Sequence, residues 1–243
     1  MNRYPSNSYY NSDEFIANNF RDLGIFDLKA SASAQFSEEE LKNIVEKYPH
    51  EKITIVDLRL EYHGFVNGIP MTFRNHYPSS TTFDPSQEKN ILIDLVNDKQ
   101  FATETLKYYS KFSNITEINY SLTEEQLSLN YHCNYQRFPL KDHHFPTSQQ
   151  FASIVNFLNK IEKDPKQRIH VHCAAGRGRT AIFLVIYDIF KNHKLTTIEQ
   201  IFTRQAKLGG ANLANIAYED EWPNDQKQNI QMLYDFYEQL NQS

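Results

Sequence analysis

Apolar positions along this chain recur at the spacing of strands and helices in turn. Residues 53–58 alternate β-branched side chains and predict a buried strand, and residues 168–171 predict the end of another. Residues 181–187 are apolar nearly all round, which is typical of a helix in the core. Strands that alternate with helices predict an α/β fold, with a mainly parallel central sheet flanked by helices on both faces.

Capping boxes predict where several helices begin. In a capping box, the side chain of a hydroxyl residue and that of an acid or amide three positions later each accept a hydrogen bond from the other residue's backbone N–H. The predicted pairs are Ser37 with Glu40, Thr147 with Gln150, and Thr196 with Glu199. The helices that they open are predicted to run to Tyr48, to about Ile161 and to Leu208, where Gly209 and Gly210 end the third. A last helix is predicted near residues 230–240.

The remaining segments give a coarser picture. Residues 1–20 are rich in Asn, Ser and Tyr and are predicted to form an N-terminal arm, with residues 21–243 as a single domain. Glycines and prolines mark residues 61–88 as a loop-rich insertion. Shorter elements are predicted at residues 90–96 (a helix) and at residues 117–120 and 131–138 (strands).

Composition narrows the classes of function. A net charge of −5 and a pI near 6.0 argue against general nucleic-acid binding, so a polyanionic substrate must be attracted by local positive charge. No apolar run is long enough to span a membrane, and no signal peptide is visible. Two cysteines do not form a disulfide framework. We therefore expect synthesis in a cytoplasm, with non-classical export left open.

The chemistry is concentrated in one run between a predicted strand and the core helix. Its residues are His172-Cys173-Ala174-Ala175-Gly176-Arg177-Gly178-Arg179-Thr180. Amides at a helix N-terminus lack partners and the helix dipole is positive there, so an anion is favoured. Five residues between Cys173 and Arg179 allow the loop to curl with its amides inward, and Gly176 and Gly178 suit that curl. The run predicts a phosphate cradle with its own nucleophile.

Each residue of the run has an expected role. The planar fork of Arg179 can bind two phosphoryl oxygens, and the positive field favours the nucleophilic thiolate of Cys173. Thr180 is expected to donate to that thiolate, and His172 to brace the loop. The predicted phosphate-binding residues between them are Ala174, Ala175, Gly176, Arg177 and Gly178. The alternative interpretation is an inert core cysteine beside a basic helix start.

These residues resemble the His-Cys-x5-Arg-Ser/Thr signature of the cysteine-dependent protein tyrosine phosphatase superfamily. A second segment, residues 57–68, is similar to the Asp-Leu-Arg-x-Glu-x-His-Gly-x-x-Asn-Gly segment of its PTP-like inositol polyphosphate phosphatases, the cysteine phytases. Further similarities lie at residues 28–37, 142–147 and 204–210. The resemblance, from about Phe20 to Tyr237, implies a protein tyrosine phosphatase-like catalytic domain.

The resemblance also implies roles beyond the loop. Asp142 matches the general acid, Arg21 matches an arginine that contacts substrate phosphate, and Lys141 adds positive charge beside the acid. An ion-pair and hydrogen-bond scaffold around the pocket wall is expected from four residues of one segment, Asp57, Arg59, Glu61 and His63.

The implied function is metal-independent and cofactor-free hydrolysis of phosphate monoesters on myo-inositol polyphosphates, a small-molecule substrate class, through a phosphocysteine intermediate. Two alternatives stay open. One is a protein tyrosine, dual-specificity or phosphoinositide phosphatase with the same machinery, against which the basic Arg177 speaks mildly. The other is a non-catalytic phosphate-binding module. The sequence does not predict an oligomeric state.

Overall fold

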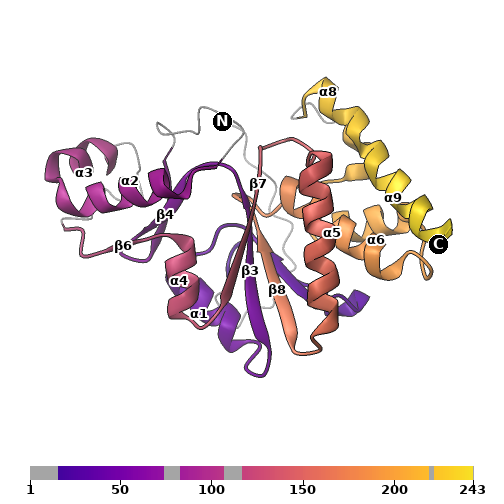
Figure 1. Cartoon of the computed structure of the whole chain (residues 1–243), viewed down its shortest axis with the longest axis horizontal. Helices are drawn as coiled ribbons and strands as arrows, with labels where there is room; N and C mark the ends of the chain where they lie inside the picture. The colour runs from indigo at the N-terminus through magenta and orange to yellow at the C-terminus, as the bar shows by residue number, and fades with distance from the viewer. Residues whose placement is uncertain (1–15, 74–82, 107–116, 219–221, 243) are drawn as a thin grey trace.

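A central sheet of five strands organises the described part of the chain, with strand order β1-β2-β8-β3-β7 (Figure 1). The computed structural model describes residues 16–73, 83–106, 117–218 and 222–242, so most of the predicted arm lies outside the described residues. The strands are β1 (Arg21–Asp22), β2 (Ala30–Ser33), β3 (Lys52–Arg59), β7 (Asn134–Leu140) and β8 (Gln167–His172). Only the pairing of β1 with β2 is antiparallel in this sheet, which confirms the predicted mainly parallel α/β architecture.

Helices cover both faces of this sheet. On one side lie α5 (Ser148–Lys163), α6 (Gly178–Asn192), α7 (Ile198–Lys207) and α9 (Gln231–Gln242), and on the other lie α1 (Glu38–Glu46) and α4 (Glu124–Asn130) (Figure 1). Successive side chains of a strand point to opposite faces. Accordingly Ile53 and Ile55 of β3 pack toward α1 and α4, whereas Val56 and Leu58 join the larger core around α6, most of whose residues are buried.

The predicted loop-rich insertion at residues 61–88 is partly wrong, because it contains a β-hairpin and a helix start. β4 (His63–Val66) and β5 (Ile69–Thr72) pair with β6 (Ser121–Leu122) in a second sheet, which packs with α2 (Pro85–Asn97) and α3 (Lys99–Leu106). Asn67 and Gly68 both have positive φ, as a two-residue hairpin turn requires. Residues 74–82 lie outside the described residues.

Some predicted boundaries also move. The third capping box is formed by Thr197 and Gln200, one residue later than predicted, with Gly209 at positive φ after the helix. The strand predicted at residues 117–120 is β6 at 121–122, and the strand predicted at 131–138 begins at Asn134, after a turn with His132 at positive φ.

Short helices complete the described chain. These are η1 (Gly24–Phe26), η3 (Leu213–Tyr218), α8 (Asn224–Lys227) and η4 (Gln228–Ile230). Among the described residues, no helix combines the length and apolar character that crossing a membrane demands.

Candidate active site

The signature loop, residues 173–177, joins the end of β8 to the start of α6, so the predicted strand–loop–helix arrangement is present. Cys173 is 3% exposed, whereas Ala174, Ala175 and Arg177 reach solvent. Gly176 has a φ of +68°, and a Cβ there would lie 2.4 Å from the carbonyl oxygen of Ser33. The loop therefore turns tightly against the end of β2 at a position that only glycine fits.

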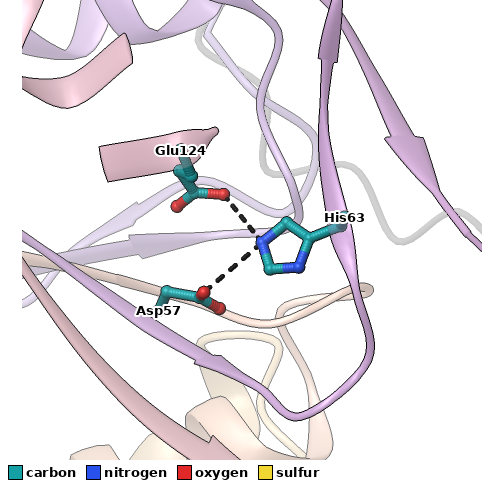
Figure 2. A group of neighbouring side chains, drawn as sticks. All are labelled: Asp57, His63 and Glu124. Atoms are coloured by element: carbon teal, nitrogen blue, oxygen red, sulfur yellow. Dashed lines mark hydrogen bonds and ion pairs between the residues drawn. The ribbon is translucent and has the colours of Figure 1, made fainter. Parts of the chain in front are cut away.

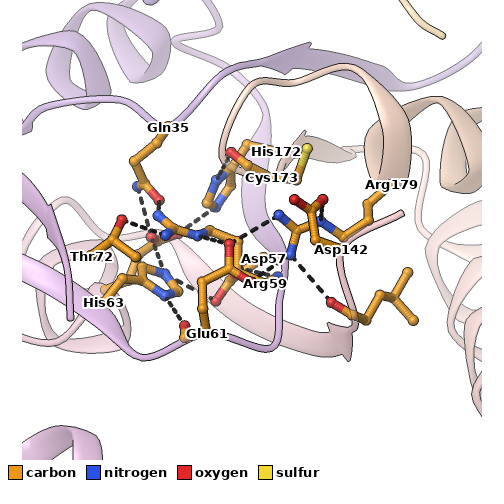
Figure 3. A network of polar contacts seen from close by, with 12 residues as sticks. Gln35, Asp57, Arg59, Glu61, His63, Thr72, Asp142, His172, Cys173 and Arg179 are labelled. Carbon is orange, nitrogen blue, oxygen red and sulfur yellow. Dashed lines mark hydrogen bonds and ion pairs between the residues drawn. The ribbon is translucent and has the colours of Figure 1, made fainter. Parts of the chain in front are cut away.

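Arg179 is held by two-point contact with a carboxylate. Its Nη1 and Nη2 atoms donate to Glu61 Oε2 at 2.7 Å and Oε1 at 2.9 Å, and Nη1 also donates to the Leu140 carbonyl (Figure 3). Burial alone would raise the pKa of Glu61, but its hydrogen bond with Arg179 and the charge of Arg59 lower that pKa to about 2. The pair is therefore ionised and fixes the guanidinium beside the loop.

His172 is anchored on the opposite side of the loop by Glu124, at the start of α4. The distance from His172 Nε2 to Glu124 Oε1 is 2.5 Å, and His172 Nδ1 lies 3.4 Å from the Cys173 carbonyl oxygen. Burial would raise the pKa of Glu124, yet the charge of His172 helps to lower it to about 2. Gln35 donates to the same carboxylate and accepts from Arg59, which itself donates to Glu61. A continuous hydrogen-bonded chain thus links both ends of the loop.

Asp57, His63 and Glu124 form a second buried cluster behind this chain (Figure 2). His63 Nε2 lies 3.3 Å from Asp57 Oδ2 and 3.1 Å from Glu124 Oε2. Burial and Arg59 lower the pKa of His63, but Asp57 reverses this and raises it to about 9. By distance these three could ligate a metal ion. A protonated imidazole already bridges the two carboxylates, so we assign the cluster to charge balance.

The candidate general acid lies next to the loop arginine. Asp142 Oδ1 is 3.2 Å from Arg179 Nε, and Oδ2 is 3.5 Å from Nδ1 of His143, whose ring packs edge-on against Trp222. The Asp142 side chain is 51% exposed, so a substrate can approach it from solvent. Lys141 beside it is exposed, and its expected contact with substrate stays a prediction.

Two other predicted residues are placed differently from expectation. Arg21 is 5% exposed and donates to the carbonyls of Asn19 and Gly176, so it contacts the loop backbone, and burial lowers its pKa to about 10. Its predicted contact with substrate phosphate is not tested by these bonds. Thr180 is fully buried, and its hydroxyl has no hydrogen-bond partner among the described residues, so the expected bond to Cys173 is not formed in this structure.

The site therefore presents a buried guanidinium close to a buried sulfur. Arg179 Nε and Thr180 Oγ1 are both buried and make no hydrogen bond within the described ranges, although Arg179 Nε forms an ion pair with Asp142 Oδ1 at 3.2 Å. A buried donor without a hydrogen bond is costly, and an oxyanion is one ligand that can accept from it. The sequence did not predict the contacts of Glu124, Gln35 and Asn19 around the loop, because each is made across a long stretch of chain.

The central parallel sheet and the Cys-x5-Arg loop before a core helix define a protein tyrosine phosphatase-like fold. The family model for PTP-like phytases, which is described by the words "Inositol hexakisphosphate", matches residues 56–191. Because that range is more than half of the chain, this chain belongs to the PTP-like phytase family.

Solved structures agree with this assignment. The PTP-like myo-inositol phosphatase from Mitsuokella multacida, in complex with myo-inositol-(1,3,4,5)-tetrakisphosphate, superposes with a TM-score of 0.70 at 27% identity, over 95% of this chain and 42% of that one. A PTP-like phytase from Bdellovibrio bacteriovorus gives 0.71 at 26% identity, over 92% and 83%.

A curated relative is the effector protein hopD2 of Pseudomonas syringae pv. tomato, which is 28% identical over 76% of this chain and 42% of its own length. AvrBs1.1 of Xanthomonas campestris pv. campestris, which is uncharacterised, is 44% identical over 20% of this chain and 48% of its own length. The chain therefore spans less than half of these curated relatives.

Replacing Glu124 tests the anchor of His172. Glu124→Gln keeps the shape but removes the charge that His172 and His63 face, so the free energy of unfolding should fall by about 3 kcal/mol or more. Glu125→Gln is the matched control, because Glu125 is exposed on the same helix, and it should change stability by less than about 0.5 kcal/mol. Chemical denaturation measures both, and equal stabilities for the two variants would contradict the assignment.

The raised pKa of His63 predicts how stability depends on pH. Folded His63 binds its proton more tightly than unfolded His63, so this proton stabilises the folded state. The contribution is complete below pH 6.5 and is lost as the pH rises from 6.5 through about 9. The free energy of unfolding should fall over this window by up to about 3 kcal/mol. His63→Gln removes the titrating ring, so its decline should be much shallower. Denaturation series from pH 6 to 9.5 measure both proteins. If the free energy of unfolding falls equally with pH in the wild type and in His63→Gln, other groups cause the decline.

Proposed function

We propose that this chain hydrolyses phosphate monoesters of myo-inositol polyphosphates, without a metal ion, through a phosphocysteine intermediate on Cys173. The observation that carries the proposal is a buried sulfur on Cys173, followed by a loop whose first amides donate no hydrogen bond among the described residues and by the buried, fixed guanidinium of Arg179. Support for the substrate class comes from membership of the PTP-like phytase family and from the inositol tetrakisphosphate bound to the Mitsuokella multacida relative.

The first step forms the intermediate. The Cys173 thiolate attacks phosphorus in line with the ester bond, a P–S bond forms, and the P–O bond to the inositol oxygen breaks. Arg179 and the loop amides hold the equatorial oxygens, where negative charge is spread in the transition state. Asp142 gives its proton to the leaving oxygen, because an alkoxide departs slowly without one.

The second step regenerates the enzyme. Water attacks the phosphocysteine, Asp142 now accepts a proton from that water, and the P–S bond breaks to release inorganic phosphate and the thiolate. Both steps require Asp142 near the phosphorus, and its contacts with Arg179 and His143 keep it beside the loop. The first step needs the proton on Asp142 and the second needs the carboxylate, so one residue serves both as acid and as base.

Arg177 favours a substrate that carries phosphates beyond the one cleaved. It lies exposed on the signature loop, one residue before the start of α6. A guanidinium at that place attracts additional anionic groups of a polyphosphorylated ring. A simple phosphotyrosine peptide offers no such groups near its scissile ester.

Cys173→Ser should release no phosphate from inositol hexakisphosphate, a loss of more than about a thousandfold, because serine lacks the thiolate. Cys133→Ser is the matched control and should retain activity, since Cys133 is a buried thiol whose pKa burial raises to about 11. Wild-type activity should persist in a chelator.

Phosphate release between pH 4 and pH 8 measures these outcomes. No turnover by the wild type, with phosphate still bound, would identify a binding module. Faster turnover of a phosphotyrosine peptide or a phosphoinositide would move the function to those substrates.

Asp142→Asn should lower kcat on inositol hexakisphosphate by about 10²-fold or more, because asparagine donates no proton to the leaving oxygen. The loss should be much smaller on para-nitrophenyl phosphate, whose leaving group departs without protonation. Asp27→Asn, at an exposed position whose side chain contacts Lys191, should behave as wild type on both substrates. Equal losses of the Asp142 variant on the two substrates would remove Asp142 from the general-acid role.

A further inference from the structure

The carbonyl groups of the signature loop all accept hydrogen bonds from outside the loop turn. His172 Nδ1 donates to the Cys173 carbonyl, and the backbone amides of Gln35 and Ala211 donate to the carbonyls of Ala174 and Arg177. The Asn19 side chain donates to the carbonyls of Ala175 and Gly176. The Arg21 side chain also donates to the Gly176 carbonyl. Within the described ranges, the amides of Ala174, Ala175 and Gly176 donate no hydrogen bond.

The difference between bonded carbonyls and unbonded amides follows from the direction in which each peptide unit of the loop points. A peptide unit is planar and trans, so its carbonyl and its N–H point in opposite directions. A carbonyl that is held outward therefore turns the amide of the next residue inward. Holding the carbonyls of Ala175 and Gly176 aims the amides of Gly176 and Arg177 at the centre of the loop, where an anion binds.

Among the described residues, only these two central carbonyls are held by side chains at a distance. Backbone amides hold the carbonyls of Ala174 (3.1 Å) and of Arg177 (2.9 Å from Ala181 and 3.3 Å from Ala211). The Asn19 Nδ2 atom lies 3.3 Å from the Ala175 carbonyl oxygen and 3.2 Å from that of Gly176. Side-chain donors can be removed by substitution, whereas backbone donors cannot.

Asn19 is itself fixed by an unusual backbone and by a third segment. Its φ is +56°, a left-handed conformation that asparagine tolerates better than most residues. Its Nδ2 atom also lies 3.2 Å from the carbonyl oxygen of Gly209, and a Cβ at Gly209 would lie 2.3 Å from Asn19 Oδ1. The glycine that ends α7 is thus required for Asn19 to reach the loop.

Arg21 reaches the same carbonyl from the edge of the sheet. Its backbone pairs with Ala32 in β2, and its Nη2 atom donates to the Gly176 carbonyl at 2.8 Å. The side chain is 5% exposed, so this bond is shielded from competing water. Its guanidinium also places a positive charge behind the loop, on the side away from solvent.

We propose that Asn19 and Arg21 are positioning residues that orient the amides of the signature loop toward the phosphoryl group. The proposal deepens the proposed function, on which it rests for the identity of the ester. The binding of inorganic phosphate by the loop does not depend on that identity, so the two can fail separately.

Asn19→Asp is the decisive variant. Aspartate has the same shape and tolerates the same backbone, but it presents only acceptors to three carbonyl oxygens. The dissociation constant of inorganic phosphate, measured by calorimetry, should rise by about tenfold or more, because charge-assisted bonds from misdirected amides are lost. Asn18→Asp is the matched control: it adds the same charge one residue away, at an exposed position, and should leave phosphate binding unchanged.

Two further variants separate orientation from folding. Asn19→Gly keeps the left-handed backbone available and removes only the donor, so it should weaken phosphate binding while the melting temperature stays near that of the wild type. Arg21→Lys retains a donor and a charge and should keep more phosphate affinity than Arg21→Gln. For each variant, kcat on para-nitrophenyl phosphate should fall together with phosphate affinity.

The inference is overturned if folded Asn19→Asp and Asn19→Gly bind phosphate as tightly as Asn18→Asp. It is supported if they bind more weakly, even when the wild type does not hydrolyse inositol hexakisphosphate, since that second result concerns the proposed function alone.

Discussion

The two-point contact between Glu61 and Arg179 is the interaction on which the rest of this structure depends. A guanidinium that is 1% exposed needs a matched carboxylate, and breaking such a buried pair costs about 3–5 kcal/mol. The same carboxylate accepts from Arg59, where the hydrogen-bonded chain to His172 begins. One hydrogen-bonded network therefore fixes the positions of Arg179, which follows the loop, and of His172, which precedes it. A displacement of either side chain disturbs the hydrogen bonds of the other.

The second sheet supplies part of this network. Asp57 and His172 are register partners on neighbouring parallel strands, so their side chains meet where β3 and β8 end. Those two strands alone cannot balance the charges gathered there. His63 enters from β4, Glu88 from α2 and Glu124 from α4, all within the segment between β3 and β7. The predicted insertion at residues 61–88 thus supplies His63 and Glu88, and α4 supplies Glu124.

Local signals predicted the loop and its flanking elements, because β8, the signature loop and α6 are contiguous and need no long-range information. Prediction failed where two local signals competed. Thr196 with Glu199 and Thr197 with Gln200 both fit a capping box in sequence, and the structure uses the second pair. The hairpin turn at Asn67 was hidden among glycines and prolines, although Asn-Gly is a strong hairpin signal. Contacts such as that of Glu124 with His172, 48 positions apart, have no local signature at all.

The hydrogen bonds of the signature loop favour an anion as its ligand. Every carbonyl from Cys173 to Arg177 accepts a hydrogen bond from outside the centre of the loop, so the carbonyls point away from that centre. The donors differ, since the amides of Ala174, Ala175 and Gly176 donate no hydrogen bond among the described residues. A tetrahedral oxyanion satisfies that excess of donors from one side. Leaving these amides without acceptors is costly, which is the physical basis for the phosphate binding that we propose.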